Sequence, residues 1–513
     1  MTLNKVGREI PKPFEPYKGP FTRPPVYPKG YKPKMLRFKQ PGMEKILPSI
    51  KDAISKTGLS SGMTVSFHHH LRNGDAVLNM VMEQIAAAGL KDMTVISSSL
   101  TTAHDPLLEH MQSGVVTKIH SSGLRSAIGN YVSKGHFEEP VIIRSHGGRA
   151  RCIECGDVHI DVAFLASPTC DTYGNVNGCM GPSACGSLGY AIIDALYADQ
   201  VVAVTDNLIP YPNPRISIGQ KDVDFIVEVD SIGDPTKIAS GSTRITTNPK
   251  DLIIAQVTAD VIEQSGFMKN GMSFQTGTGG SSLAVAKYLR DKMIAQDIKG
   301  SFASGGITGY LASMAKEGLF ETLFDVQTFD LGGVASLREN PLLHREMCAS
   351  TYANPHNSGC VVNNLDVMIL SALEIDTNFN VNVITGSNGV PRGASGGHSD
   401  TAAGSKLGIV VCPLFRGRNP TVKERVETIV TPGETVDVVV TERGLAVNPE
   451  SKHSGELQSN LKNLKVPLLS IEELKNKAYG YTGKPHEIRF GEKTVAVIEY
   501  RDGSAIDVIR NVK

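Results

Sequence analysis

One pattern of apolar and polar positions occurs twice along this chain, at residues 62–85 and again at residues 271–294. The first copy reads GMTVSFHHHLRNGDAVLNMVMEQI and the second reads GMSFQTGTGGSSLAVAKYLRDKMI, and the two align without a gap. In each copy a short apolar run ends in a loop of small or polar residues, after which apolar residues recur at helical spacing. Each copy therefore predicts a strand, a loop and a helix, in that order.

A second pair of similar segments follows downstream in each half. Residues 161–177 read DVAFLASPTCDTYGNVN, and residues 366–382 read DVMILSALEIDTNFNVN. The two pairs stand in the same order at nearly the same offset, which one coincidental match would not explain. We infer that a whole domain of alternating strands and helices has been duplicated. The predicted fold class is α/β, with two duplicated open domains whose sheets are mostly parallel.

The length of 513 residues suits two domains of about 200 residues with extensions, because single hydrophobic cores rarely grow beyond about 300 residues. We expect a proline-rich N-terminal arm over residues 1–45, a first domain over 46–255, and a second domain with a C-terminal extension over 256–513. The prolines of the arm exclude a regular helix or a central strand there. Composition does not decide whether the arm is disordered or lies across a neighbouring subunit.

Charge and hydropathy narrow the class of function. Lysine plus arginine equals aspartate plus glutamate at 52 each, without long runs of one sign, so nothing indicates a nucleic-acid-binding surface. The N-terminal segment lacks the apolar stretch of a signal peptide, and no segment approaches the roughly 18 apolar residues of a membrane span. These features predict a cytoplasmic enzyme that acts on small molecules and binds neither nucleic acid nor membrane.

Eight cysteines in a chain of this length are typical of reduced thiols rather than of a disulfide framework. Cys152 and Cys155 form a CxxC motif with His159 four residues further on, which is the most metal-like grouping in the sequence. A structural zinc site needs a second close pair at a defined spacing, and the cysteines further along do not provide one. Buried thiols and no bound metal are therefore the expectation.

Two short glycine loops in the second half carry candidate chemistry. The loop TGTGGSS, residues 276–282, opens directly onto a predicted helix, where free backbone N–H groups and the positive helix end attract a carboxylate, a phosphate or a developing oxyanion. A purely structural turn explains this loop as well. In FASGGITG, residues 302–309, paired glycines let consecutive N–H groups face one point, as the oxyanion of a thioester or anhydride requires.

Longer polar loops form a second group of candidates. The loop at residues 386–405 is long for a simple connection and holds polar side chains among its glycines. In the first half, FHHHLRNGD occupies the place of the TGTGGSS loop, and a histidine there together with Arg72 is suited to a carboxylate; ordinary polar loop residues are the alternative. The segment IIRSHGGRARC adds arginines at positions 144, 149 and 151 and His146, either as carboxylate forks or as structural ion pairs.

Several of these strings resemble one family. DVAFLASPTCDTYGNVN resembles the segment of CoA-transferases in which an apolar strand leads to an aspartate and a Gly-Asn turn. GGITGYLASMAKEGLF, GVPRGASGGHSDTAAGS and VDVVVTERGLAVNP are similar to their glycine loop and helix, their glycine-rich stretch and their closing strand. The likeness covers nearly all of residues 46–450, and the proline-rich arm and FHHHLRNGD add a resemblance to the α subunits of citrate lyases.

This resemblance implies a fold of two related open α/β domains with the active site between them. It implies a reaction in which citrate displaces acetate from an acetyl thioester on an acyl carrier (γ) subunit, after which a β subunit cleaves the citryl group. The thiol would belong to a dephospho-CoA-derived group on the carrier, with CoA thioesters as surrogates, and this chain would hold no covalent cofactor of its own. A homo-oligomer within a larger complex is expected.

The chain departs from the larger CoA-transferase families at their nucleophile. The strand position that carries a glutamate in those families matches Gln327 or Thr328 here, and neither is a carboxylate. A covalent glutamyl intermediate is therefore not expected, and citrate itself would attack the thioester in a ternary complex. Glu374, the nearest carboxylate at a matching strand end, keeps a covalent mechanism open.

Each group of candidate residues receives an expected role. Catalytic roles are expected for Gly305, Gly306, Gln327 and Thr328. Contacts to the thioester and CoA moiety are expected from Gly277, Gly279, Gly280, Ser281, Asn388, Gly389, Gly396, Gly397 and Asp400. Contacts to citrate are expected from His69, His70, Arg72 and Arg392.

Two other functions are compatible with these residues. One is an acyl-CoA transferase or hydrolase that uses a glutamyl-enzyme intermediate and free CoA. The other is a sugar-phosphate sensor of related fold, in which the glycine loops only hold an anion. Balanced charge and the absence of a fused helix-turn-helix motif disfavour the sensor.

Overall fold

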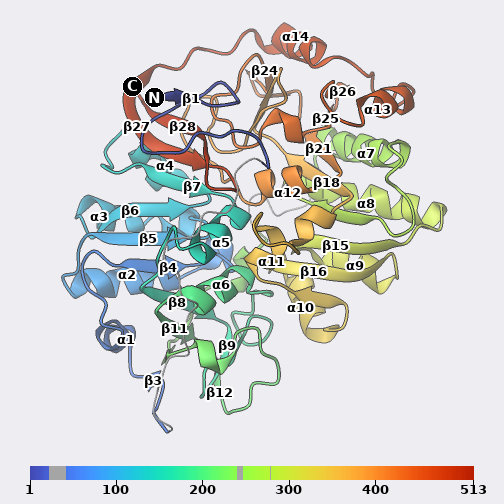
Figure 1. Cartoon of the computed structure of the whole chain (residues 1–513). Helices are drawn as coiled ribbons and strands as arrows, with labels where there is room; N and C mark the ends of the chain where they lie inside the picture. The colour runs from blue at the N-terminus through green and yellow to red at the C-terminus, as the bar shows by residue number, and fades with distance from the viewer. Residues whose placement is uncertain (22–41, 240–245, 278) are drawn as a thin grey trace.

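The duplication predicted from the sequence is present as two open sheets that share one strand order. The computed structural model describes residues 1–21, 42–239, 246–277 and 279–513. Figure 1 shows the two sheets side by side, the first in blue to teal and the second in green to orange, with several helices packed between them.

The first sheet contains, in spatial order, β28 (Ala505–Val512), β27 (Phe490–Glu499), β7 (Val141–Arg144), β6 (Val116–Ser121), β5 (Met93–Ser97), β4 (Thr64–Phe67), β8 (Val162–Ser167), β11 (Gln200–Thr205), β13 (Phe225–Glu228) and β3 (Ile46–Leu47). The second contains β17 (His344–Glu346), β16 (Phe320–Thr328), β15 (Gly300–Ile307), β14 (Ser273–Thr276), β18 (Val367–Ser371), β21 (Leu407–Val411), β25 (Val438–Thr441) and β26 (Gly444–Val447). The run from β7 to β13 thus matches the run from β17 to β25 strand for strand. Within these runs neighbouring strands are parallel, which confirms the predicted fold class.

The duplicated segments also repeat their hydrogen bonds. A carboxylate oxygen of Asp161 accepts a bond from the Thr64 N–H at 2.7 Å. At the equivalent place in the second domain, Asp366 accepts from the Ser273 N–H at 2.8 Å. The aspartate just before β8 therefore fixes the start of β4 in the first domain. The aspartate just before β18 fixes the start of β14 in the second.

Helices cover both faces of the sheets. Those of the first domain are α1 (Ile50–Lys56), α2 (Val77–Ala87), α3 (Leu107–Gln112), α4 (Ser126–Ser133), α5 (His146–Glu154) and α6 (Gly189–Tyr197), with the 3-10 helices η1 (Arg72–Gly74), η2 (Thr102–His104), η3 (Gln220–Asp222) and η4 (Pro235–Lys237). Those that follow are α7 (Pro249–Gln264), α8 (Gly280–Ala295), α9 (Gly309–Lys316), α10 (Leu331–Glu339), α11 (Ala349–Ala353), α12 (His398–Gly404), α13 (Ser454–Asn460) and α14 (Ile471–Thr482), with η6 (Val361–Asn364) and η7 (Gly433–Thr435). Because helices on both faces bury a parallel sheet, β8 is buried along its whole length.

Short strands complete each domain. The first domain has a small sheet of β10 (Val176–Asn177), β9 (Thr169–Asp171) and β12 (Leu208–Ile209), and the second repeats it with β20 (Val381–Asn382), β19 (Glu374–Asp376) and β24 (Val422–Lys423). Two hairpins stand apart, β1 (Thr2–Leu3) with β2 (Glu9–Ile10), and β22 (Phe415–Arg416) with β23 (Asn419–Pro420). The small paired sheets extend the duplication beyond the two main sheets.

The N-terminal arm packs on the chain's own C-terminal hairpin. The Tyr17 N–H donates to the Ala505 carbonyl at 3.0 Å, and the Asn4 side-chain amide donates to the Ile506 carbonyl at 2.8 Å. The Tyr17 ring meets the Tyr500 ring edge to face, with centroids 4.8 Å apart. Figure 1 accordingly places both termini together above the first sheet. The rest of the predicted arm, residues 22–41, lies outside the described residues.

The domain limits differ from the sequence-based boundaries at two places. Helix α7 belongs entirely to the second domain, since both Ile254 and Val261 enter its core, so the boundary at 255 falls inside a helix. The C-terminal segment does not stay with the second domain, because β27 pairs in parallel with β7 and β28 follows as the edge strand. Tertiary contacts decide which core helix α7 joins and which sheet the C-terminal hairpin pairs with. Neither periodicity nor composition reveals these contacts.

Two properties of the chain as a whole follow from the elements. No helix among the described residues is long and apolar enough to cross a bilayer. All eight cysteines, each within the described part, are free thiols, and seven of them are buried, as the sequence indicates.

The returning hairpin is fixed by a buried ion cluster, and this generates a stability prediction. The Glu499 carboxylate on β27 accepts both forks of the Arg144 guanidinium at 2.8 Å and one from Arg151 at 2.9 Å. Burial alone would raise the pKa of Glu499, but the Arg144 and Arg151 charges hold it below its usual value. Glu499→Gln would leave the buried Arg144 guanidinium without its counter-charge and Arg151 with only Asp157 as its partner, so the free energy of unfolding should fall by about 3–5 kcal/mol in urea denaturation at neutral pH.

Glu492 on the same strand provides the control, because its side chain is exposed. Glu492→Gln should change the free energy of unfolding by no more than about 0.5 kcal/mol. The ionised form of Glu499 is the stabilising one, so the difference between wild type and Glu499→Gln should shrink as the pH falls below the unfolded carboxyl pKa of about 4.3. Equal stability of the two variants at neutral pH would contradict this account.

Candidate functional site

A cavity of about 600 Å³ lies where the two domains meet. Its lining from the first domain includes His69, Arg72, Ser99, Thr101, Ser122, Arg125, His146 and Tyr190. Its lining from the second includes Asp251, Gln275, Thr276, Gly277, Gly279, Gly280, Ser281, Gly306, Gln327, Phe329, Tyr352, Arg392, Gly396, Gly397, His398 and Arg416.

Strand direction explains why these residues meet. His69 comes two residues after β4, Ser99 two after β5, Ser122 one after β6 and His146 two after β7. Gly277 follows β14, and the cavity also takes residues from the ends of β15, β16 and β18. The carboxyl ends of both parallel sheets therefore open onto one space, the usual place for ligands in open α/β folds.

A stack of rings forms one wall of the cavity. The Tyr190 ring lies 5.1 Å from the His69 ring at an interplanar angle of 14°, and 4.5 Å from the His146 ring. The His69 Nδ1 lies 2.6 Å from the Ser98 hydroxyl. Burial lowers the pKa of His69 well below its ordinary value and that of His146 to about 3. Both imidazoles are neutral near pH 7 and can offer hydrogen bonds but no charge.

Positive charge on the first-domain side comes from Arg72 and Arg125. The Arg72 guanidinium carbon lies 5.5 Å from the centre of the Phe329 ring, and its Nε has no hydrogen-bond partner among the described residues. Burial and the neighbouring Arg125 charge lower the pKa of Arg72 to about 10, so it stays charged. Arg125 donates to the Leu100 carbonyl at 2.7 Å. Two adjacent cations that form no ion pair with a carboxylate in the described part of the chain suit an anionic ligand.

The second domain adds arginines nearer to solvent. Arg392 and Arg416 line the cavity and are exposed. Within the described lining, Asp251 is the one carboxylate, and it already accepts a bond from the Thr246 hydroxyl at 3.0 Å. The cavity therefore carries a positive balance.

The described lining residues of the TGTGGSS loop, 276–277 and 279–281, reach the cavity at the N-terminus of the 16-residue helix α8; residue 278 lies outside the described residues. Gly279 has φ +129°, and a Cβ there would lie 2.1 Å from the Ser371 hydroxyl, so no side chain fits. Beside it, the Thr276 hydroxyl and the side-chain amide oxygen of Gln275 are buried without a partner among the described residues. Two unpaired polar side-chain atoms thus lie on this side of the cavity.

Of the paired glycines of β15, one lines the cavity and the other does not. Gly306 lines the cavity, and a Cβ on it would lie 2.0 Å from the Phe329 ring. Gly305, at φ +96°, packs instead against the Gln275 side chain. The two residues straddle an irregularity in the pairing of β15 with β16.

The two candidates on β16 also separate. Gln327 lines the cavity and donates from its amide to the His69 carbonyl at 3.1 Å, which ties the two domains together. Thr328 points to Gly186, and its hydroxyl accepts the Ser187 N–H at 3.2 Å. Successive strand residues face opposite ways, so one of the pair turns from the cavity.

The long loop crosses to the first domain through its backbone. The Ser395 N–H donates to the Ser122 carbonyl at 2.7 Å, and the His146 N–H donates to the Gly396 carbonyl at 2.8 Å. A Cβ on Gly123 would lie 2.1 Å from the Gly393 carbonyl oxygen, so this approach requires glycine. Gly396, Gly397 and Arg392 line the cavity as a result.

Besides Gly305 and Thr328, four further candidate residues lie outside the cavity lining. His70 stacks on Tyr190 with centroids 5.2 Å apart, and burial lowers its pKa well below the ordinary value. Asn388 is exposed, and Gly389 packs against Phe490. Asp400 is buried behind the glycine loop, where its carboxylate accepts the Ser145 hydroxyl at 2.8 Å and the Gly147 N–H at 2.9 Å.

Glu374 is also remote from the cavity lining. Its carboxylate binds the Lys423 ammonium at 2.9 Å and accepts from the Asn382 amide at 2.9 Å. All three residues are buried in the small sheet of the second domain. The geometry gives Glu374 a structural ion pair in place of a substrate.

The basic segment after β7 divides in the same way. Only His146 of its four cationic or imidazole residues lines the cavity. Arg149 binds the buried Asp194 carboxylate with two nitrogens at 2.8 and 2.9 Å, while Arg144 and Arg151 bind Glu499. The structural ion pairs left open by the sequence are thus present.

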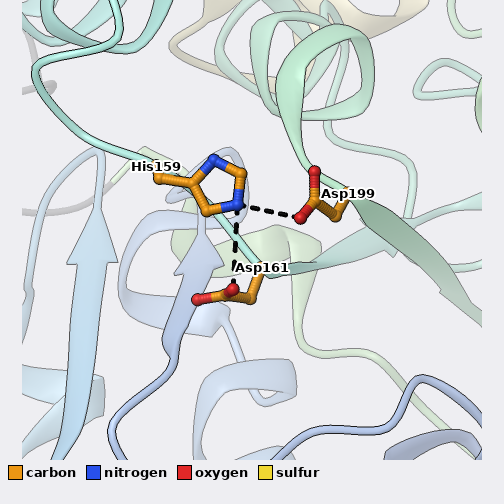
Figure 2. Close-up of side chains that lie close together, drawn as sticks. All are labelled: His159, Asp161 and Asp199. Carbon is orange, nitrogen blue, oxygen red and sulfur yellow. Dashed lines mark hydrogen bonds and ion pairs between the residues drawn. The ribbon is translucent and has the colours of Figure 1, made fainter. Parts of the chain in front are cut away.

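The CxxC motif and His159 are not assembled into a metal site. Figure 2 shows His159 between two aspartates, with its Nε2 2.8 Å from Asp199 and 3.7 Å from Asp161. The His159 side chain is 63% exposed. Cys155 instead contacts His356, at 3.6 Å from Sγ to Nδ1, and Cys152 donates to the Arg149 carbonyl. The group in Figure 2 is a hydrogen-bonded cluster at the surface that contains no cysteine.

Sequence reasoning missed several polar residues of the lining. These are Ser99, Thr101, Ser122, Arg125, Tyr190, Gln275 and Arg416. Ser99 and Ser122 lie within two residues of the ends of β5 and β6, and Arg125 lies four residues after β6, so tracing the residues after every strand would have found them. Tyr190 lies inside a helix of the first domain, where no local signal separates it from a core residue.

The two matched open α/β sheets, with a cavity at their carboxyl ends, have the fold of the CoA-transferase type. More narrowly, the chain belongs to the citrate lyase α-subunit family: the family model "Citrate lyase, alpha subunit (CitF)" matches residues 43–512. Citrate lyase alpha chains of Haemophilus influenzae and Escherichia coli are 53% and 52% identical to it over 469 residues, which is 91% of this chain and 93% and 91% of theirs.

Solved structures agree. A Streptococcus mutans protein described as the α subunit of citrate lyase, crystallised with citrate, is 54% identical, has a TM-score of 0.95, and aligns over 99% of this chain and 100% of that one. The α subunit of a malonate decarboxylase from Acinetobacter baumannii shares the fold at 16% identity with a TM-score of 0.63, over 85% of this chain and 87% of that one.

The buried environment of Asp400 predicts an unusual pH dependence of stability. Burial raises the pKa of Asp400 to about 6, although the Arg501 charge opposes the change. The folded state therefore holds a proton that the unfolded carboxyl, with a pKa near 3.9, releases more readily. The stabilising contribution is complete below about pH 3.9 and is lost as the pH rises through about 6.

We expect the free energy of unfolding of wild type, relative to Asp400→Asn, to fall by about 3 kcal/mol between pH 4 and pH 7. Urea denaturation of both proteins across this range measures the difference. Asp366→Asn serves as the comparison, because the Asp366 carboxylate also accepts a backbone N–H, from Ser273 at the start of β14, and Asp366 is not part of the cavity lining. A constant difference between wild type and Asp400→Asn would show that this carboxyl does not hold the extra proton.

Proposed function

We propose that this chain transfers an acyl carrier between carboxylates: citrate replaces acetate on the carrier thioester, which yields a citryl thioester and free acetate. The observation that carries the proposal is the charge of the cavity. Arg72 and Arg125 face it beside neutral imidazoles, and Asp251 is the one carboxylate in its described lining. The citrate held by the Streptococcus mutans relative supports a tricarboxylate as the ligand.

The proposed reaction balances without a net proton. A citrate carboxylate oxygen attacks the acetyl carbonyl carbon, and the C–S bond breaks as the electron pair leaves with the thiolate. The product is a mixed anhydride of acetate and citrate. The same thiolate then attacks the citryl carbonyl of that anhydride, and acetate leaves with the electron pair of the broken C–O bond.

Such a reaction depends on placement more than on acid-base groups. His69 and His146, with lowered pKa values, would act as neutral hydrogen-bonding groups. Holding the carboxylate against the thioester is worth up to about 7–11 kcal/mol in favourable cases. Each well-placed oxyanion donor contributes about 3–4 kcal/mol, and the backbone N–H groups near Gly306 and at the start of α8 are the candidates.

The cavity lining favours direct attack by citrate over a glutamyl-enzyme intermediate. No glutamate lies among the described lining residues, and Glu374 is held in its ion pair with Lys423. Gln327 occupies the place expected for a nucleophile, and its amide holds the His69 carbonyl. A ternary complex of citrate, thioester and enzyme is the mechanism that these positions support.

Membership of the citrate lyase α-subunit family supports a proposal about the partners. The thioester would be carried by the dephospho-CoA-derived group of an acyl carrier subunit, and a β subunit would cleave the citryl product. The exposed Arg392 and Arg416, on the second-domain side of the cavity, would contact the dephospho-CoA-derived group of the carrier. We propose a cytoplasmic complex that contains more than one copy of this chain.

The direct test follows acyl exchange. Purified protein is incubated with ¹⁴C-acetyl-CoA as the surrogate thioester, and acetate release is followed with citrate, with citramalate and without an acceptor. Release that requires citrate supports the proposal. Release without any acceptor would instead indicate a hydrolase.

Substitution of Arg72 tests the role of the buried cations. We expect Arg72→Ala to lower kcat/KM for citrate about 100-fold, because loss of one partner from a desolvated charge pair costs about 2–5 kcal/mol. The KM for the thioester should change little. Arg290→Ala on the outer side of α8 is the matched control, since Arg290 pairs with Glu317 at the surface, and it should leave both constants unchanged.

Trapping separates the two mechanisms. If citrate attacks directly, hydroxylamine or borohydride treatment after exposure to acetyl-CoA should label no carboxylate of the protein. Mass spectrometry of the digested chain detects either modification. A labelled glutamate, Glu374 included, would contradict the ternary mechanism and favour the covalent alternative.

A further inference from the structure

Arg72 has a backbone conformation that residues other than glycine rarely adopt. Its φ is +54°, in the left-handed region, although the residue carries a side chain. Such conformations cost about 1–3 kcal/mol and persist where surrounding contacts impose them. Because Arg72 is the first residue of η1 and lines the cavity, this backbone conformation decides where its guanidinium points.

Besides the main-chain bonds of η1 itself, the Arg72 backbone has a side-chain contact with Thr101, at the start of η2. The Thr101 hydroxyl donates to the Arg72 carbonyl oxygen at 3.2 Å. Thr101 itself lines the cavity beside Arg72. Any group that fixes Thr101 therefore fixes two lining residues together.

His104 holds Thr101 from behind. The His104 Nδ1 accepts the Thr101 N–H at 2.9 Å, so in the neutral ring the proton is on Nε2. That Nε2 lies 3.0 Å from a carboxylate oxygen of Asp75, to which it donates. Both side chains are buried, and neither lines the cavity. Asp75 directly follows η1, so the contacts close a ring that joins η1 to η2.

We infer that His104 and Asp75 are positioning residues for citrate binding, which act through Thr101 and Arg72. This inference rests on the proposed function. The carboxylate selects the Nε2-protonated ring, the free Nδ1 then accepts from Thr101, and the Thr101 hydroxyl holds the Arg72 carbonyl. The guanidinium is thereby presented to the cavity before citrate arrives, which lowers the cost of ordering it on binding.

The second domain contains a matched control for this unit. His344 lies 3.2 Å from Asp325 through Nδ1 and 3.0 Å from the Ser336 hydroxyl through Nε2. All three residues are buried, and none lines the cavity. Loss of His344 should therefore destabilise the fold in the manner of His104 without reaching Arg72.

The experiment measures the citrate dissociation constant of the full chain by calorimetry, together with the urea midpoint. We expect His104→Ala to raise the dissociation constant about 10- to 100-fold, the range typical when a binding group is displaced by about 1 Å. His344→Ala should lower the urea midpoint similarly and leave the dissociation constant within about twofold of wild type, because distant sites act independently.

Two conservative variants keep the test decisive if His104→Ala does not fold. His104→Asn retains an acceptor near the Nδ1 position for Thr101, and His104→Gln retains a donor near the Nε2 position for Asp75. Each should weaken citrate binding less than the alanine variant. In an Arg72→Ala background, substitution of His104 should add no further loss, because both changes remove the same contact.

The outcomes separate the inference from the function on which it rests. If wild type binds citrate but His104 variants bind it equally well, or His344→Ala weakens binding as much as His104→Ala, the positioning role is overturned while the proposed function stands. If wild type does not bind citrate, the proposed function fails and this inference fails with it. The positioning role is supported if citrate affinity falls in the His104 variants but not in His344→Ala, and if substitution of His104 causes no further fall in the Arg72→Ala background.

Discussion

The structure depends on a close main-chain contact between its two domains. Residues 393–396 of the second domain lie against the backbone that follows β6 in the first, and Gly123 has no room for a side chain because a Cβ would lie 2.1 Å from the Gly393 carbonyl. The His146 N–H donates across the same junction. This contact brings the carboxyl ends of two parallel sheets to one cavity, so the site exists only where the domains are joined.

The buried arginines then fall into two groups: those paired with a protein carboxylate stabilise the fold, and those without such a partner are available to bind a ligand. Buried arginines with a protein carboxylate, such as Arg149 with Asp194, hold elements in place. Arg72 and Arg125 keep their charge but face a cavity with little competing carboxylate, which leaves them for an external anion. The neighbouring imidazoles stay neutral because burial disfavours their protonated forms, so they do not add further repulsion to a cationic cavity.

The duplication, the parallel sheets and the glycine loops could be read from the sequence, because each has a local signature in periodicity or composition. The site was harder. His69 and Arg72 were found because they stand in a loop after a strand, whereas Arg125 follows a strand in a segment without unusual composition. His70 and Thr328 adjoin the lining residues His69 and Gln327 in the sequence, but they turn away from the cavity because adjacent residues project in different directions. Such divisions, like the return of β27, are fixed by tertiary packing alone.

The position of β27 has a consequence for how this chain is made. Until residues 490–499 have been synthesised, β7 has no neighbour on that side, and the first sheet carries an open edge of unpaired backbone groups. Arg144 and Arg151 also await their shared counter-charge on Glu499. The first domain therefore reaches its final form only after the whole second domain has left the ribosome, and the two ends of the chain mature together.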